Sequence, residues 1–172
     1  MQKVHFIQQE ARRQGKRDYR VEIDFTNAFN AMSQAALWRV MRMVKIPDAD
    51  LLEQIYEGAM VRLAPNDEEN ATDAFTTGVA QGSITSLQHF NIFINALLRM
   101  LTVTGQNEDI GQVLQIVKDQ KGDNQWDENG YQFNNIGFIN DFSIFVDIPE
   151  GMQKQLNVVQ EFTAWCEMQI NV

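Results

Sequence analysis

The stretch GFINDFSIFVD, residues 137–147, is the best starting point for interpreting this sequence. Two apolar runs, 135–139 and 142–148, are separated by Asn140 and Asp141. An Asn-Asp pair between apolar runs favours a tight turn, so the stretch predicts a β-hairpin with a carboxylate at its tip. Taken alone, the pair is explained better by ordinary turn chemistry than by a functional role.

A second carboxylate lies near the end of another predicted strand. Residues 19–25 (YRVEIDF) alternate with period two, which predicts a strand, and Asp24 is its penultimate residue. A carboxylate on a strand that faces a carboxylate on a hairpin suits divalent metal binding, because Mg²⁺ prefers hard oxygen ligands. Two such ions can clamp the attacking and leaving oxygens of a phosphoryl transfer. The alternative is that Asp24 is a cap or a surface residue.

The remaining pattern predicts one α+β domain over residues 1–172, with a three- or four-stranded antiparallel sheet and helices packed on one face. Helices are expected at 5–17, 34–45, from 48 onward, 84–103 and 152–168, and strands at 59–64 and 73–79. A turn is expected at 27–30, and a short element at 110–117 in the polar segment 105–130. Asn30 or Ser33 is expected to cap the helix at 34–45, and Asp48 the next helix, whose apolar stripe is Leu51, Leu52, Ile55 and Tyr56.

The net charge of −9 and the pI near 4.6 differ from those of most nucleic-acid-binding domains, which carry a basic face. The positive charge is concentrated before residue 21. The candidates for nucleic-acid contact in that segment are Arg12, Arg13, Lys16 and Arg17. The alternative is that these side chains form a solvated helix face.

No apolar run approaches the roughly 20 residues of a membrane helix, and the N-terminus lacks the apolar core of a signal peptide. We therefore expect an intracellular protein without membrane contact, with nucleus and cytoplasm left open. The single cysteine and two histidines argue against a zinc site.

Five segments, in this order along the chain, resemble motifs of reverse transcriptases. They are VEIDFTNAFN (21–30), ALWRVMRMVKIP (36–47), TTGVAQGSITSLQHFNIFINALL (76–98), GFINDFSIFVD (137–147) and VVQEFTAWCEMQIN (158–171). The resemblance implies a polymerase palm, acting with an RNA template, a DNA primer and deoxynucleoside triphosphates. The motifs are more similar to those of non-LTR retrotransposon and group II intron enzymes than to retroviral ones.

The same resemblance implies a metal site for Mg²⁺ or Mn²⁺. It makes Asp24 a ligand, aided by the main-chain carbonyl of Phe25, and matches Asp141 to the second aspartate of the hairpin motif. Asn140 stands where the family has the first hairpin aspartate. An amide oxygen can coordinate a cation but adds no negative charge, so we expect weakened metal binding and impaired catalysis.

Nucleotide contacts follow from the other matched motifs. Phe29 falls at the steric-gate position, where an aromatic ring disfavours a 2′-hydroxyl. Gln81 and Gly82 fall where the family's chain passes close to the nascent base pair, and glycine has no Cβ to obstruct that approach.

The sequence lacks most of a fingers domain and all of a thumb, so we do not expect processive synthesis from this chain alone. Activity of the chain itself stays open. The main alternative is a decayed or domesticated palm that serves as a scaffold or nucleic-acid-binding module. An unrelated α+β binding domain is the third possibility.

Overall fold

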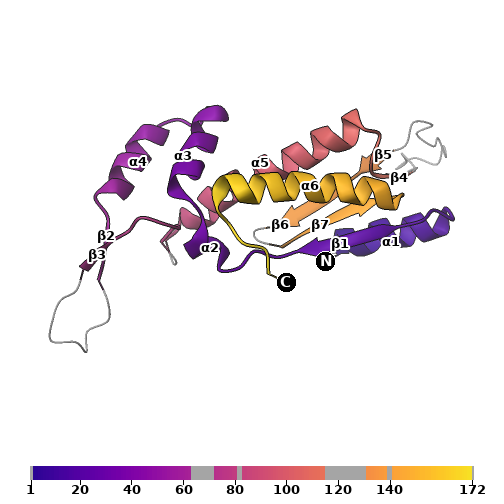
Figure 1. Ribbon diagram of the computed structural model, residues 1–172, viewed down its shortest axis with the longest axis horizontal. Helices are drawn as coiled ribbons and strands as arrows, with labels where there is room; N and C mark the ends of the chain where they lie inside the picture. The colour runs from indigo at the N-terminus through magenta and orange to yellow at the C-terminus, as the bar shows by residue number, and fades with distance from the viewer. Residues whose placement is uncertain (1, 63–71, 81–82, 115–130, 139–140, 172) are drawn as a thin grey trace, which may run out of the picture.

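A three-stranded antiparallel sheet organises the protein (Figure 1). The computed structural model describes residues 2–62, 72–80, 83–114, 131–138 and 141–171. The strand order is β1–β7–β6, formed by β1 (Tyr19–Ile23), β7 (Asp141–Val146) and β6 (Asn135–Phe138). The predicted α+β class, the strand at Tyr19 and the hairpin beside it are therefore confirmed.

Two long helices pack on one face of this sheet. Helix α5 (Ser86–Asn107) contacts β6, helix α6 (Pro149–Cys166) contacts β7, and the two helices contact each other. The rings of Phe93 and Phe162 lie 5.3 Å apart between them. The even-numbered residues of β7 face this layer and are almost fully buried: Phe142, Ile144 and Val146. The alternation of the strand thus gives the sheet one continuous apolar face.

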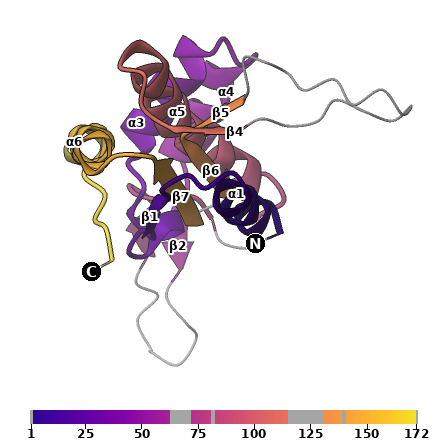
Figure 2. The ribbon, with the colours of Figure 1, turned by 90° about the vertical axis from the view of Figure 1, so that its right-hand side faces the viewer.

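The opposite face of the sheet is partly covered by helix α1 (Gln2–Arg13) (Figure 2). Ile7 and Ala11 of this helix form a small buried cluster with Phe145 and Leu114. The expected helical layer is present as α5 and α6, and α1 adds a second, shorter cover. The part of this face that α1 does not fill carries polar side chains.

The other elements lie toward the two ends of the molecule (Figure 1). They are the helices α2 (Ala28–Ala31), α3 (Gln34–Met43) and α4 (Ala49–Glu57), and the strand pairs β2 (Met60–Arg62) with β3 (Thr72–Ala74) and β4 (Gln112–Leu114) with β5 (Tyr131–Phe133). Among the described residues, no helix has the length and apolarity to cross a membrane.

Three local predictions were wrong. Residues 28–31 form the short helix α2 rather than a turn, after Asn27 in the left-handed conformation. Asp48 occupies the expected N-cap position of α4, but its side chain makes no cap hydrogen bond, whereas Ser33 caps α3 by accepting from the Ala36 amide at 3.3 Å. Ile84 precedes α5 and is 89% exposed, so the buried helix begins later than expected.

Burial on α4 also differs from the predicted stripe. Leu52 and Tyr56 are half-buried, but Leu51 and Ile55 are 54% and 58% exposed. The four residues span more of the helix circumference than α3 alone can cover, because α4 lies at the edge of the molecule (Figure 1). The apolar stripe identified the helix but not the width of its contact.

Candidate active site

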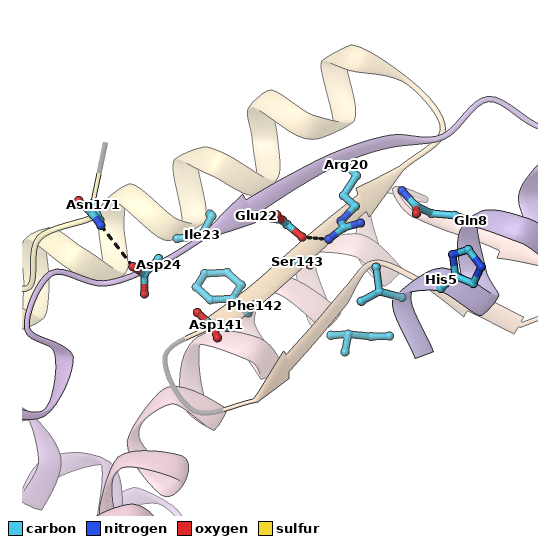
Figure 3. A pocket seen from close by; sticks show the side chains of 12 residues that line it. His5, Gln8, Arg20, Glu22, Ile23, Asp24, Asp141, Phe142, Ser143 and Asn171 are labelled. Atoms are coloured by element: carbon cyan, nitrogen blue, oxygen red, sulfur yellow. Dashed lines mark hydrogen bonds and ion pairs between the residues drawn. The ribbon is translucent and has the colours of Figure 1, made fainter. Parts of the chain in front are cut away.

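The two strand-borne carboxylates line one pocket. Strand β1 pairs antiparallel with β7, and the last pair of the ladder joins Ile23 to Phe142. Continuing the register by one step places Asp24 opposite Asp141, on the same face of the sheet. Both aspartates line a pocket of about 950 Å³, into which their side chains project (Figure 3).

Period-two alternation makes this pocket polar. Residues 20, 22 and 24 of one strand stand opposite 145, 143 and 141 of the other, and five of these six line the pocket. Its full lining is Val4, His5, Gln8, Arg20, Glu22, Ile23, Asp24, Ile136, Asp141, Phe142, Ser143 and Asn171. The first three of these come from α1, which forms one wall. The same sheet that gives an apolar core on one face therefore gives a charged cavity on the other.

Main-chain hydrogen bonds fix the position of Asp24. The chain leaves β1 at this residue, and Phe25 then forms an isolated antiparallel bridge with Ile170. The amide of Asn171 donates to the main-chain oxygen of Asp24 at 2.9 Å. Its side-chain amide Nδ2 also donates to Oδ2 of the carboxylate at 3.3 Å (Figure 3). Asp24 is half-buried, whereas Asp141 is exposed.

Opposite charges are paired at the other end of the pocket. The guanidinium of Arg20 forms an ion pair with Glu22 and lies 6.0 Å from the centroid of the Phe145 ring. Because Glu22 is committed to Arg20, the aspartate end keeps the stronger negative character. Just before the strand, burial raises the pKa of Asp18, against the opposing effects of a Gln8 hydrogen bond and nearby arginines.

The available ligands fit a weak cation site better than one in which the protein alone supplies all the ligands. Asp24 and Asp141 supply two carboxylates, and Mg²⁺ commonly binds through one or two carboxylates together with water and substrate phosphates. Among the described residues, no group of three or more His, Cys, Asp or Glu side chains could hold a metal ion. Asn140 lies outside the described residues. The two aspartates are therefore suited to a cation that a substrate helps to hold.

The predicted nucleotide-contacting aromatics do not line this pocket. Phe25 is 2% exposed, and its ring packs 5.8 Å from that of Phe142. Phe29 is half-buried in α2, with its ring 4.8 Å from that of Phe90. These contacts make both rings part of the core. The predicted contacts Gln81 and Gly82 lie outside the described residues.

The chain that leads toward residues 81 and 82 is nevertheless tied to Phe29. The amide of Val79 donates to the Phe29 carbonyl at 2.8 Å. Gly78 has a φ of +76°, and a Cβ at that position would lie 2.5 Å from the same carbonyl oxygen. Glycine is required there by both the backbone conformation and the close approach. Two of the recognised motifs, 21–30 and 76–98, are thereby held against each other.

The basic segment is accessible but does not line the pocket. Arg12, Arg13 and Arg17 are exposed and Lys16 is half-buried. The guanidinium of Arg13 forms an ion pair with Glu10 at 2.5 Å, and its hydrogen bond lowers the pKa of that carboxyl.

Several lining residues were not identified from the sequence. The alternation that placed Asp24 on one face of its strand also places Glu22 there, and the same rule extends from Asp141 to Ser143. That signal was available. No local pattern indicates His5. Asn171 is the last residue of the motif at 158–171, but that motif does not show that the tertiary fold brings Asn171 to the pocket.

Comparison with known proteins agrees with this architecture. The chain is similar to a solved structure of telomerase from Candida albicans in complex with a TWJ fragment of telomeric RNA, with a TM-score of 0.55 and 11% sequence identity. The match covers 98% of this chain and 29% of the telomerase chain, so this chain spans less than a third of that protein's length. Among curated proteins, no sequence matches. The sequence profile of the family described as reverse transcriptase (RNA-dependent DNA polymerase) matches residues 1–172, and the chain therefore belongs to the reverse transcriptase family.

Proposed function

We propose that this chain is the palm of a reverse transcriptase, and that its parent enzyme copies RNA into DNA by two-metal nucleotidyl transfer. The observation that carries the proposal is that Asp24, directly after β1, and Asp141, the first residue of the neighbouring strand β7, line one pocket. This is the arrangement that the predicted metal chemistry requires. From the residues of its motifs, we also propose that the chain comes from a retroelement of the non-LTR or group II intron type.

The aspartates would hold Mg²⁺ or Mn²⁺, which when bound lowers the pKa of the attacking hydroxyl and neutralises charge on the leaving phosphates. The carboxylates of Asp24 and Asp141 would bind and orient the cation. The main-chain carbonyl of Phe25 would add a neutral oxygen ligand. Phe29 excludes a 2′-hydroxyl from the incoming sugar. Gln81 and Gly82 pass beside the nascent base pair.

The partners of the proposed enzyme are an RNA template, a DNA primer and a deoxynucleoside triphosphate. With a net charge of −9, the chain needs a local source of positive charge to hold nucleic acid. Arg12, Arg13, Lys16 and Arg17 supply it at one end of α1 and in the segment that follows. Fingers and thumb segments of a longer parent protein would supply the rest.

A catalytically dead palm is the second candidate, and Asn140 favours it. Replacing a carboxylate by an amide removes one negative charge from a site that would face two divalent cations. Charges about 4 Å apart interact by roughly 4 kcal/mol at an effective dielectric constant near 20, so one lost charge weakens metal occupancy strongly. A palm with this change could persist as a scaffold or as a nucleic-acid-binding module.

Metal affinity tests the proposed metal site, which both candidates share. We expect weak Mn²⁺ and Mg²⁺ binding by the parent chain, binding at least about tenfold tighter by Asn140→Asp, and none by Asp24→Asn. Isothermal titration calorimetry measures all three. Asp147→Asn is the matched control, because it removes one charge from an exposed residue that does not line the pocket and should leave the affinity unchanged.

Primer extension on an RNA template, with the chain restored to its longer protein, then tests activity. Extension that Asn140→Asp increases supports the impaired polymerase. Tighter metal binding without any extension supports the scaffold. Equal metal affinity in the parent, Asn140→Asp and Asp24→Asn would contradict the proposed metal site.

A further inference from the structure

Asn171 is joined to Asp24 by two hydrogen bonds although 147 positions separate the two residues in the sequence. One bond is from the Asn171 main-chain amide to the Asp24 main-chain oxygen, at 2.9 Å. The other is from the Asn171 side-chain Nδ2 to the carboxylate Oδ2, at 3.3 Å. Figure 3 shows both side chains at the same end of the pocket. The first bond fixes the backbone of Asp24, and the second acts on its carboxylate.

The backbone of this C-terminal segment is held without help from the Asn171 side chain. Glu167 ends α6 in the left-handed conformation, and Met168 is 4% exposed. The amide of Thr26 donates to the carbonyl of Gln169 at 2.9 Å, beside the bridge between Phe25 and Ile170. These contacts join the segment to the end of β1. The Asn171 side chain is therefore available for a role other than holding the fold.

An amide is well suited to orient a metal-binding carboxylate. Its N–H group donates to one oxygen and limits rotation of the carboxylate about its Cβ–Cγ bond. It carries no charge, so it does not neutralise the aspartate as a lysine or arginine would. Partners of this kind orient the groups that ligate a metal, and their removal typically reduces metal affinity.

We propose that Asn171 is a positioning residue for Asp24, which it holds in the orientation that binds the cation. The inference rests on the proposed function, since it assigns Asn171 a part in the same site. It adds the C-terminal segment to a site otherwise formed by β1 and β7. The bridge between Phe25 and Ile170 then has a role in the site, because it holds the neighbouring residue Asn171 at the pocket.

The test compares Asn171→Ala with Gln169→Ala in the full chain. Asn171→Ala removes the side-chain bond and keeps the main-chain bond. Gln169→Ala truncates an exposed side chain in the same segment, outside the pocket, and keeps the carbonyl that bonds Thr26. We expect Asn171→Ala to weaken Mn²⁺ binding about tenfold, as measured by calorimetry, and Gln169→Ala to leave it unchanged.

A double-mutant cycle in metal-free protein tests the contact itself. We expect the effects of Asn171→Ala and Asp24→Ala on denaturant unfolding to be non-additive, as they are for side chains that interact. Additive effects, or parental Mn²⁺ affinity in Asn171→Ala, would overturn the inference. If Asp24→Asn also keeps parental affinity, the metal site of the proposed function is wrong. If Asp24→Asn loses binding and Asn171→Ala does not, only the positioning role is wrong.

Discussion

The two faces of the β1–β7 ladder differ in what their side chains do. On one face, Ile23, Phe142 and Ile144 are buried against α5 and α6 and form part of the main core. On the other, Asp24 and Asp141 line an open pocket beside α1. Along this ladder, residues that stabilise the core therefore alternate with residues that line the candidate site. The comparison teaches that neighbouring substitutions in one strand should have different kinds of effect.

The largest effect is expected at the apolar face. Ile144→Ala should lower the free energy of unfolding by about 2–5 kcal/mol. The side chain of Ile144 is fully buried, so its truncation leaves a cavity in the core. Its neighbour Ser143 is 6% exposed on the pocket face, and Ser143→Ala should cost only about 1 kcal/mol. Denaturant unfolding followed by circular dichroism measures both. Equal losses would show that the two faces share the stabilising role.

Phe29 tests whether one residue can serve both roles. Its half-buried ring packs on Phe90, so Phe29→Ala should destabilise the chain by about 2 kcal/mol, less than a fully buried phenylalanine. If Phe29 is also the steric gate, the same change should raise ribonucleotide incorporation relative to deoxyribonucleotide incorporation.

Primer extension with each type of nucleotide measures the gate, in the proposed longer protein and in the Asn140→Asp background. Phe90→Leu is the control, because it loosens the same aromatic contact without changing the gate residue. An unchanged nucleotide ratio in Phe29→Ala would leave Phe29 with its core role alone.

The smallest effect concerns a titratable group on the apolar side. Burial lowers the pKa of His89, which is 4% exposed and packs against Trp38 and Tyr56. Below about pH 6.5 the unfolded chain takes up a proton that the folded protein resists. The free energy of unfolding should therefore fall as the pH drops from 6.5 toward the lowered pKa, by less than the ceiling of about 1.4 kcal/mol per pH unit for one proton.

Unfolding curves at pH 7.5, 6.5 and 5.5 check this slope. His89→Gln should remove most of it, and His5→Gln, at an exposed position, should not. The same pH dependence in the parent and in His89→Gln would assign the slope to other groups.

Much of the fold could be predicted because its main elements carry local signals. The apolar positions at helical spacing are Phe90, Ile94, Leu97, Leu98 and Leu101; in α5 Leu98 is half-buried and the other four are buried. The pairing of β4 with β5 could not be predicted, because nothing local in residues 112–114 indicates residues 131–133 as their partner. Periodicity specifies an element and its face. It does not specify what that face meets.

The same limit applies to the candidate site. Asp24 was predicted at the end of a strand and Asp141 in a hairpin turn, and the structure brings them to one pocket. Gln8 lies far along the chain from the hairpin, and no pattern in the sequence links the two. Asn171 ends the motif at 158–171, but that motif does not place its side chain beside Asp24. Arg12, Arg13, Lys16 and Arg17 were predicted from their charge, which indicates an accessible basic segment without locating it relative to the pocket.

The bond between Asp24 and Asn171 also has a consequence for the order of folding. One wall of the pocket is made early in synthesis, by residues between 4 and 24. The others come from Ile136, from residues 141–143 and from Asn171. Contacts between such distant segments form slowly, because a long loop must close before they are made. A nascent chain can therefore form helices such as α3 while it still lacks the pocket. The candidate site is assembled only after residue 171 has left the ribosome.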